Sequence, residues 1–202
     1  MYRLYDYLPS GNGYKVRLLL TQLDIPFELI ELDIVAGETR TPAFLSKNPN
    51  GRIPTLEIEP GVFLPESNAI MFFLAEGSAF LPNDRLGRAR VLQWMCFEQY
   101  SHEPNIATAR FWVQHLGVTE ERRAALDQKR VLGYAALGVM EQHLAERAYF
   151  VGERYSIADI ALYAYTHVAD EGGFDLAPYP AIGSWLERVR SQPRHVPITE
   201  RF

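Results

Sequence analysis

The sequence is poor in cysteine and has no excess of positive charge. Cys96 is the single cysteine among 202 residues, so no disulfide can form within the chain, which favours a reducing compartment such as the cytoplasm. Twenty Lys and Arg against 25 Asp and Glu leave a formal net charge of −5. A chain without spare cations is poorly suited to neutralising a phosphate backbone, so we expect a cytoplasmic protein that does not act on nucleic acid.

Long apolar runs and metal-ligand spacings are also missing. No stretch reaches about 18 uninterrupted apolar residues, and residues 1–7 lack both the cationic and the apolar segment of a signal peptide. The five histidines do not form an HExxH motif, and there is no glycine-rich loop of the type that holds nucleotide phosphates. We therefore expect no membrane association, no metal and no nucleotide.

The first third of the chain alternates between strand and helix signals. Residues 2–7 are short and aromatic-rich, apolar residues recur at helical spacing over 14–23, and 27–33 again has strand composition. The turn formers in 8–13 predict a loop between the first strand and the helix. The spacing predicts a parallel βαβ unit.

The next segment predicts a short helix, a hairpin and a further helix. Thr41 followed by Pro42 is typical of a helix start. Residues 55–59 and 62–64 flank Pro-Gly, the order of a type II turn, so they are expected to pair as antiparallel strands. A helix then opens at Glu66 and ends at Gly77.

Beyond residue 87 only helical patterns remain. Helices are expected over about 88–116, with a kink or break at Pro104, and over about 119–147, 156–169 and 180–190. Ser156 followed by Asp159 has the form of a capping box. Cys96, between apolar and aromatic neighbours, is expected in the core.

These patterns predict two domains. Residues 1–76 form an α/β domain of order βαβαββα, residues 77–87 a linker, and residues 88–202 an all-helical domain. The expected fold class is therefore α/β plus all-α.

Four motifs carry a resemblance to a known family. They are SGNGYK at 10–15, NPNGRIP at 48–54, ESNAI at 66–70 and GERYSIAD at 152–159. Their order and spacing are similar to those of the glutathione S-transferases. The resemblance implies a thioredoxin-like N-terminal domain that binds glutathione as a substrate, an all-helical C-terminal domain, a homodimer and a role in detoxification.

The resemblance assigns residues to the peptide part of glutathione. The backbone of Ile53, preceding a cis Pro54, would pair with the cysteinyl unit. Glu66 and Ser67 would hold the γ-glutamyl end through its ammonium and carboxylate groups. As an isolated pattern, Glu66 and Ser67 would only cap a helix.

Two arginines are candidates for the glycyl carboxylate of glutathione, Arg40 and Arg52. An arginine on a polar loop is also commonly just solvated, so the choice between them stays open.

Ser10 and Asn12 are the candidates for activating the thiol. A thiol with a pKa of about 8.5 is mostly protonated at neutral pH, so a transferase needs donors and positive potential near the sulfur. A hydroxyl or an amide just before a helix can donate to a thiolate, and the helix dipole adds to the effect. Both residues could instead only shape the loop, and which of them is the main partner stays open.

The second-substrate pocket of the family would draw on five residues. They are Tyr7, His102, Asn105, Arg110 and Phe111. A role in the core or at a dimer interface is an equal alternative for each residue of the helical domain.

Three functions fit these residues. The first is a transferase whose glutathione thiolate attacks a small hydrophobic electrophile. The second is a glutathione-dependent disulfide or peroxide reductase without a protein cysteine, which Asn12 keeps open. The third is a non-enzymatic interaction module on the same fold.

Overall fold

The computed structural model describes all of residues 1–202, which divide into two compact units. Unit 1 is Met1–Ser78 together with Pro193–Phe202, and unit 2 is Ala79–Gln192. The expected division placed 193–202 in the helical domain. In the structure these last residues belong to unit 1.

Unit 1 is built on a four-stranded mixed sheet. Its strands are β1 (Tyr2–Asp6), β2 (Phe27–Glu31), β3 (Thr55–Glu59) and β4 (Val62–Pro65), in the order β2-β1-β3-β4. β1 and β2 are parallel, while β3 is antiparallel to both β1 and β4. The predicted parallel unit and the predicted hairpin are both confirmed.

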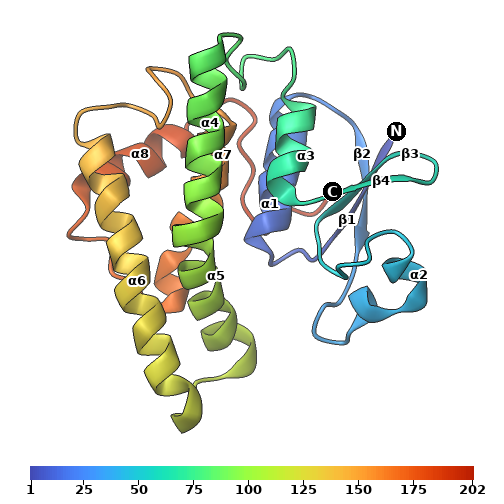
Figure 1. Cartoon of the computed structure of the whole chain (residues 1–202), viewed down its shortest axis with the longest axis horizontal. Coiled ribbons are helices and arrows are strands. Elements are labelled where there is room, and N and C mark those ends of the chain that lie inside the picture. The colour runs from blue at the N-terminus through green and yellow to red at the C-terminus, as the bar shows by residue number, and fades with distance from the viewer. The chain divides into compact units, whose positions relative to one another are not determined.

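Three α-helices complete this unit. They are α1 (Gly11–Gln22), α2 (Pro42–Leu45) and α3 (Ser67–Leu74), with a 3₁₀ turn over Glu38–Arg40. α1 and α3 pack side by side on one face of the sheet, and α2 lies on the other side (Figure 1). The thioredoxin-like order βαβαββα is therefore confirmed.

The C-terminal segment is tied to α1 by polar side chains. The Tyr14 hydroxyl donates to the Val196 carbonyl at 2.7 Å, and Arg17 Nη1 donates to the Ile198 carbonyl at 3.0 Å. Tyr14 and Arg17 are both fully buried. Because buried donors need acceptors, the tail supplies carbonyls that α1 cannot.

Unit 2 is all-helical, as predicted, and opens with one long helical stretch. α4 (Arg85–Phe97) and α5 (Glu103–Phe111) are joined by a π-helical turn at Glu98–His102, and a second π turn follows at Trp112–Leu116. The break expected at Pro104 takes the form of this first π turn. Proline has no N–H and its ring crowds the preceding turn, which a wider π turn accommodates.

The remaining helices are α6 (Glu120–Leu144), α7 (Ile157–Thr166) and α8 (Pro180–Arg190), with a 3₁₀ turn at Ala169–Gly172. α6 packs beside α5 (Figure 1). All ten residues of α7 are buried, so this helix is the core of the unit. None of the helices combines the length and hydropathy needed to cross a bilayer.

Two local predictions in unit 2 have opposite outcomes. The capping box of Ser156 and Asp159 is confirmed. The core position expected for Cys96 is wrong, because the cysteine is exposed. Helical periodicity turns the buried Trp94 inward, whereas Cys96 shares the outer face with the exposed Leu92.

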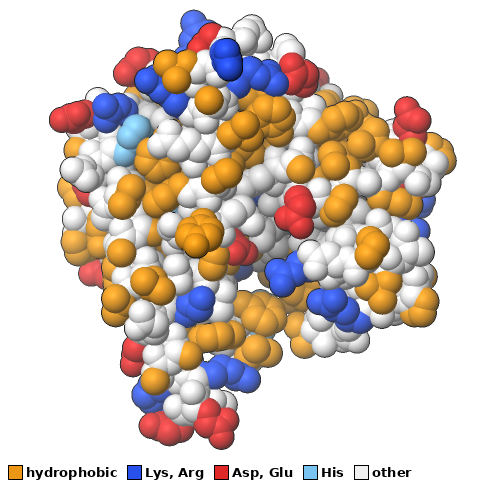
Figure 2. Space-filling model, viewed as in Figure 1, with side chains coloured by type: hydrophobic (Ala, Val, Ile, Leu, Met, Phe, Trp, Pro, Cys, Tyr) orange, Lys and Arg blue, Asp and Glu red, His pale blue; other side chains and the backbone are white.

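Charges are mixed over the visible surface. Figure 2 shows Lys and Arg interspersed with Asp and Glu on this face, and neither sign gathers into one continuous patch.

Candidate functional site

The sheet register brings three loops of unit 1 to one end of the sheet. Tyr5 on β1 pairs with Thr55 on β3, which pairs with Pro65 on β4. One step beyond this row, β1 leads toward α1, Pro54 precedes β3, and Glu66 follows β4. The predicted thiol-activating and glutathione-binding segments therefore meet at one end of the sheet, although they are far apart in sequence.

Ser10 begins α1 as its N-cap. Its backbone is extended and its Oγ accepts from the Gly13 amide at 3.3 Å. A hydroxyl that accepts one hydrogen bond still has its own proton to donate. The structure thus starts the helix at Gly11, within the stretch expected to be a loop, and places Ser10 at the positive end of the helix dipole.

Asn12, Lys15 and Ser67 form a polar cluster that links α1 to α3. Lys15 Nζ donates to Asn12 Oδ1 at 2.8 Å and to Ser67 Oγ at 3.5 Å, and the Ser67 hydroxyl donates to Asn12 Oδ1 at 3.4 Å. Lys15 is fully buried and Ser67 is 5% exposed. A residue predicted to meet the sulfur is therefore in contact with one predicted to hold the γ-glutamyl end.

The loop before β3 has the geometry that the resemblance implied. The Ile53–Pro54 peptide bond is cis. The buried Asn48 braces the loop, because its Nδ2 donates to the Arg52 carbonyl at 2.8 Å and to Thr55 Oγ1 at 3.2 Å. Sequence reasoning quoted Asn48 only as part of a motif and gave it no role.

Glu66 has an unusual backbone at the start of α3. Its φ is 71°, a region that residues other than glycine rarely adopt and that is enriched at functional sites. Glu66 occupies the N-cap position without a side-chain cap hydrogen bond, and it is exposed. Its carboxylate is therefore not used to cap the helix.

The two candidate arginines differ in placement. Arg40 lies across the loop, with Nη1 donating to the Asn50 carbonyl at 3.0 Å. Gly51 has a φ of 62°, and a Cβ there would come within 2.6 Å of Arg40 Nη1, so the glycine makes room for the guanidinium. Arg52 is exposed on the same loop. The choice of partner for the glycyl carboxylate stays a prediction.

A buried ion pair between β1 and α1 lies next to the segment that leads into α1. Arg17 Nε lies 3.0 Å from Asp6 Oδ2, and both side chains are fully buried. Burial raises the pKa of the Asp6 carboxyl to about 7, and the Arg17 charge opposes this rise. Arg17 also donates to the Leu8 carbonyl at 2.6 Å, so the pair anchors the segment that leads to Ser10.

Tyr5, on β1, is hydrogen-bonded within the sheet. The Tyr5 hydroxyl donates to Glu57 Oε2 at 3.0 Å, and burial raises the pKa of this phenol. Tyr7 lies just beyond the strand and is half-buried. Tyr5 is therefore engaged within the sheet.

The expected second-substrate residues belong to different units. Tyr7 is in unit 1 and the other four are in unit 2. Three of the four are buried and interact with neighbours in the same unit. His102 Nε2 lies 2.9 Å from Thr166 Oγ1, and the Asn105 amide donates to the Ser101 carbonyl at 2.7 Å. Arg110 forms an ion pair with Glu171 at 2.7 Å. Phe111 is half-buried beside His115. These contacts give the three buried residues structural roles, and their contribution to a substrate pocket stays a prediction.

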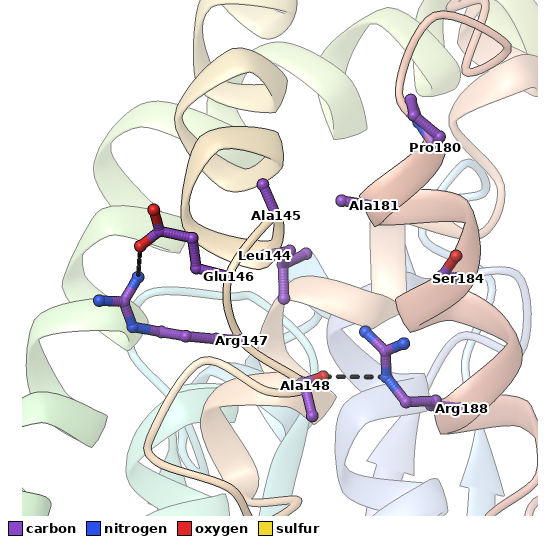
Figure 3. A pocket seen from close by; sticks show the side chains of 9 residues that line it. All are labelled: Leu144, Ala145, Glu146, Arg147, Ala148, Pro180, Ala181, Ser184 and Arg188. Atoms are coloured by element: carbon purple, nitrogen blue, oxygen red, sulfur yellow. Dashed lines mark hydrogen bonds and ion pairs between the residues drawn. The ribbon is translucent and has the colours of Figure 1, made fainter.

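An open surface pocket of about 510 Å³ lies on unit 2, between the end of α6 and α8 (Figure 3). Two of its lining residues are hydrogen-bonded, because Arg188 Nε donates to the Ala148 carbonyl at 3.1 Å. The first amides of α8, those of Ala181 and Ile182, are taken by Glu141 at 2.9 Å each. None of the predicted site residues lines this pocket.

Two further observations concern side chains that could hold a metal ion or act as a protein thiol. No group of three or more His, Cys, Asp or Glu is placed to hold a metal ion. The loop before α1 contains no cysteine. Like Asn48, Lys15 stands in a motif, SGNGYK, but nothing in the sequence indicates the polar cluster that it forms.

Two family models match the chain. The N-terminal domain of glutathione S-transferase matches residues 1–76, and the C-terminal domain of glutathione S-transferase matches residues 93–193.

Individual proteins are similar over nearly the whole chain. The disulfide-bond oxidoreductase YfcG of Escherichia coli (strain K12) is 31% identical, covering 93% of this chain and 89% of the relative. A crystal structure of a glutathione S-transferase from Pseudomonas fluorescens is 57% identical with a TM-score of 0.97, covering 98% of this chain and 99% of that one. Ure2p in complex with glutathione is 26% identical with a TM-score of 0.86, covering 96% of this chain and 95% of that one.

Proposed function

Because the chain belongs to the glutathione S-transferase family, we propose that it is a glutathione transferase that activates the thiol for attack on a small hydrophobic electrophile. The observation that carries the proposal is the convergence of three loops beyond the row of Tyr5, Thr55 and Pro65. The similarity to Ure2p, whose structure contains glutathione, supports the choice of ligand.

Unit 1 offers complementary groups along the length of the tripeptide. The backbone of Ile53 is the partner for the cysteinyl unit, in the manner of an added strand. The amides at the start of α3 can donate to the γ-glutamyl carboxylate, and the exposed carboxylate of Glu66 can accept from the ammonium. The Ser67 hydroxyl donates to Asn12 Oδ1 in this structure and would turn its one proton to the γ-glutamyl carboxylate when glutathione binds. The glycyl carboxylate is assigned to Arg40 or Arg52.

The thiol end is assigned to the start of α1. Ser10 and Asn12 donate to the sulfur, and the helix dipole favours the thiolate over the thiol. The thiolate forms a bond to the electrophilic carbon, and the leaving group departs with its electron pair or the adduct takes up a proton. Held in place, the sulfur attacks without the entropy loss of a chance encounter.

A second candidate function is disulfide reduction by glutathione. It is favoured by the similarity to a protein named a disulfide-bond oxidoreductase, and Asn12 near the start of α1 keeps it open. Because the active-site loop contains no cysteine, bound glutathione itself would be the reductant. Two glutathione molecules would reduce one disulfide to two thiols and leave as glutathione disulfide. Cys96, in unit 2, is not needed for this balance.

The first experiment measures the pKa of the glutathione thiol bound to wild type and to two variants. Wild type, Ser10→Ala and Asn12→Ala are mixed with glutathione, and the ultraviolet absorbance of the bound thiolate is followed against pH. The main sulfur partner is the residue whose loss raises the bound thiol pKa by about one to two units, the scale of a charged hydrogen bond.

Separate incubations with an aryl halide and with a small disulfide identify the reaction. A thioether product supports the transferase, and glutathione disulfide alone supports the reductase. Absence of any bound thiolate in the wild type would contradict both, and would favour a non-enzymatic interaction module.

The assembly and setting are proposed on the family resemblance. We propose a cytoplasmic homodimer with a role in detoxification. Sedimentation at micromolar concentration tests the dimer, and a monomer there would contradict it.

A further inference from the structure

Lys15 is a charged side chain in an unusual place. Its exposed fraction is 0%, although lysine is rarely fully buried without a specific partner. It lies on α1, and its ammonium group bridges Asn12 near the start of α1 to Ser67 at the start of α3.

The ammonium determines which way the Asn12 amide faces. An ammonium group has three donors and no acceptor, whereas an asparagine amide has an oxygen that accepts and an NH₂ that donates. Only the oxygen can therefore face Lys15, and the distance between Nζ and Oδ1 is 2.8 Å. The Ser67 hydroxyl donates to the same oxygen at 3.4 Å, so two donors hold one orientation.

The consequence concerns the other end of the amide. Because Oδ1 and Nδ2 point in different directions from the trigonal amide carbon, the oxygen's contact with Lys15 turns the NH₂ away from the ammonium. A reversed amide would present its oxygen instead, and an oxygen with a partial negative charge repels a thiolate. Lys15 also polarises the amide, which strengthens Nδ2 as a donor.

We propose that Lys15 is a positioning residue that holds the Asn12 amide so that its NH₂ meets the glutathione sulfur. This inference rests on the proposed function, in which unit 1 binds glutathione. It adds that the buried lysine acts on the thiol through Asn12, without touching the sulfur.

The test is a double-mutant cycle on the pKa of the bound thiol. Lys15→Met removes the ammonium and keeps an apolar side chain of similar length, Asn12→Ala removes the amide, and a third variant carries both changes. Lys47→Met is the matched control, because it removes a lysine from the same unit that contacts the Tyr5 and Phe63 rings instead of the cluster. Thiolate absorbance against pH is measured with glutathione, together with the glutathione Kd and the Tm.

A positioning role predicts coupled effects. Lys15→Met alone should raise the thiol pKa by about one unit, a tenfold loss of thiolate at a pH below both pKa values. In the Asn12→Ala background the same change should add less than half of that shift, because its route to the sulfur is gone. Lys47→Met should leave the titration unchanged.

Other outcomes overturn the inference. A folded Lys15→Met variant with the wild-type thiol pKa would do so, and so would two shifts that simply add. If Lys15→Met does not fold, Lys15→Gln serves in its place, because a neutral side-chain amide can face either end of the Asn12 amide and no longer fixes its orientation. A wild-type thiol pKa in a folded Lys15→Gln variant refutes the inference, and a rise that is lost in the Asn12→Ala background supports it. A wild type that binds no thiolate overturns the proposed function itself.

Discussion

Replacing Asp159 with alanine removes the acceptor of four hydrogen bonds inside unit 2. The fully buried carboxylate accepts from the Phe150 amide at 3.1 Å, the Ser156 amide at 2.9 Å, the Ser156 hydroxyl at 3.0 Å and Trp185 Nε1 at 3.0 Å. One side chain thus joins the start of α7, the preceding loop and α8.

The size of the loss follows from these donors. The Ser156 hydroxyl can rotate, but the two amides and the indole N–H would stay buried without an acceptor. Each such donor costs roughly 1 to 3 kcal/mol. Burial also raises the pKa of the Asp159 carboxyl to about 6, and relief of this buried charge keeps the net loss at the lower end. We expect the free energy of unfolding to fall by about 3 kcal/mol.

The assay is thermal and urea unfolding of Asp159→Ala beside wild type. For a chain of this length the Tm should fall by roughly 6 to 12 °C, whereas glutathione affinity of the folded fraction should be retained. Asp127→Ala is the control, because Asp127 is 65% exposed and has only a 3.8 Å ion pair with Arg130; its loss should stay below about 0.5 kcal/mol. A loss under 1 kcal/mol in Asp159→Ala would refute the reasoning.

The remaining predictions concern pH and packing. The folded-state pKa of Asp159 is raised to about 6 from 3.8. The folding stability gained from the protonated carboxyl is therefore complete below the unfolded-state pKa of 3.8, and it is lost as the pH rises through the folded-state pKa of about 6. Relative to Asp159→Asn, wild type should therefore gain about 1 kcal/mol between pH 7 and pH 5 in urea unfolding, and a constant difference would contradict this. Gly13→Ala should cost about 3 kcal/mol in the same assay, because its Cβ would overlap the buried Asp6 carboxylate. Gly138→Ala, a helical position with open space around its Cβ, should instead gain roughly 0.5 to 1 kcal/mol, and equal effects of the two changes would show that the overlap is not the cause.

Local signals account for the predictions that succeeded. Three examples are the capping box at Ser156, the proline at the start of α8 and the Pro-Gly turn of the hairpin. Each depends on backbone groups only a few residues away. Because a cap or a turn is determined by neighbouring backbone groups, it can be predicted from the sequence without knowing the tertiary fold.

The features that escaped prediction depend on distant partners. Lys15 looked like any charged residue of a helix until the fold placed Ser67, 52 positions later, against its ammonium. Cys96 has apolar neighbours in sequence, but the rotation of α4 in unit 2 decided that it faces outward. Burial is a property of the packed surface, and composition alone does not determine which side of a helix is covered.

The sequence by itself determined the elements, their order, the division into an α/β and a helical part, and the motifs that identify the family, because propensity, periodicity and capping are short-range. Only the tertiary structure decided that three loops meet beyond one row of the sheet, that residues 193–202 return to unit 1, and that a buried lysine donates to both Asn12 and Ser67. These depend on strand register and on which polar groups find partners after burial, and both are set by residues that lie far apart along the chain.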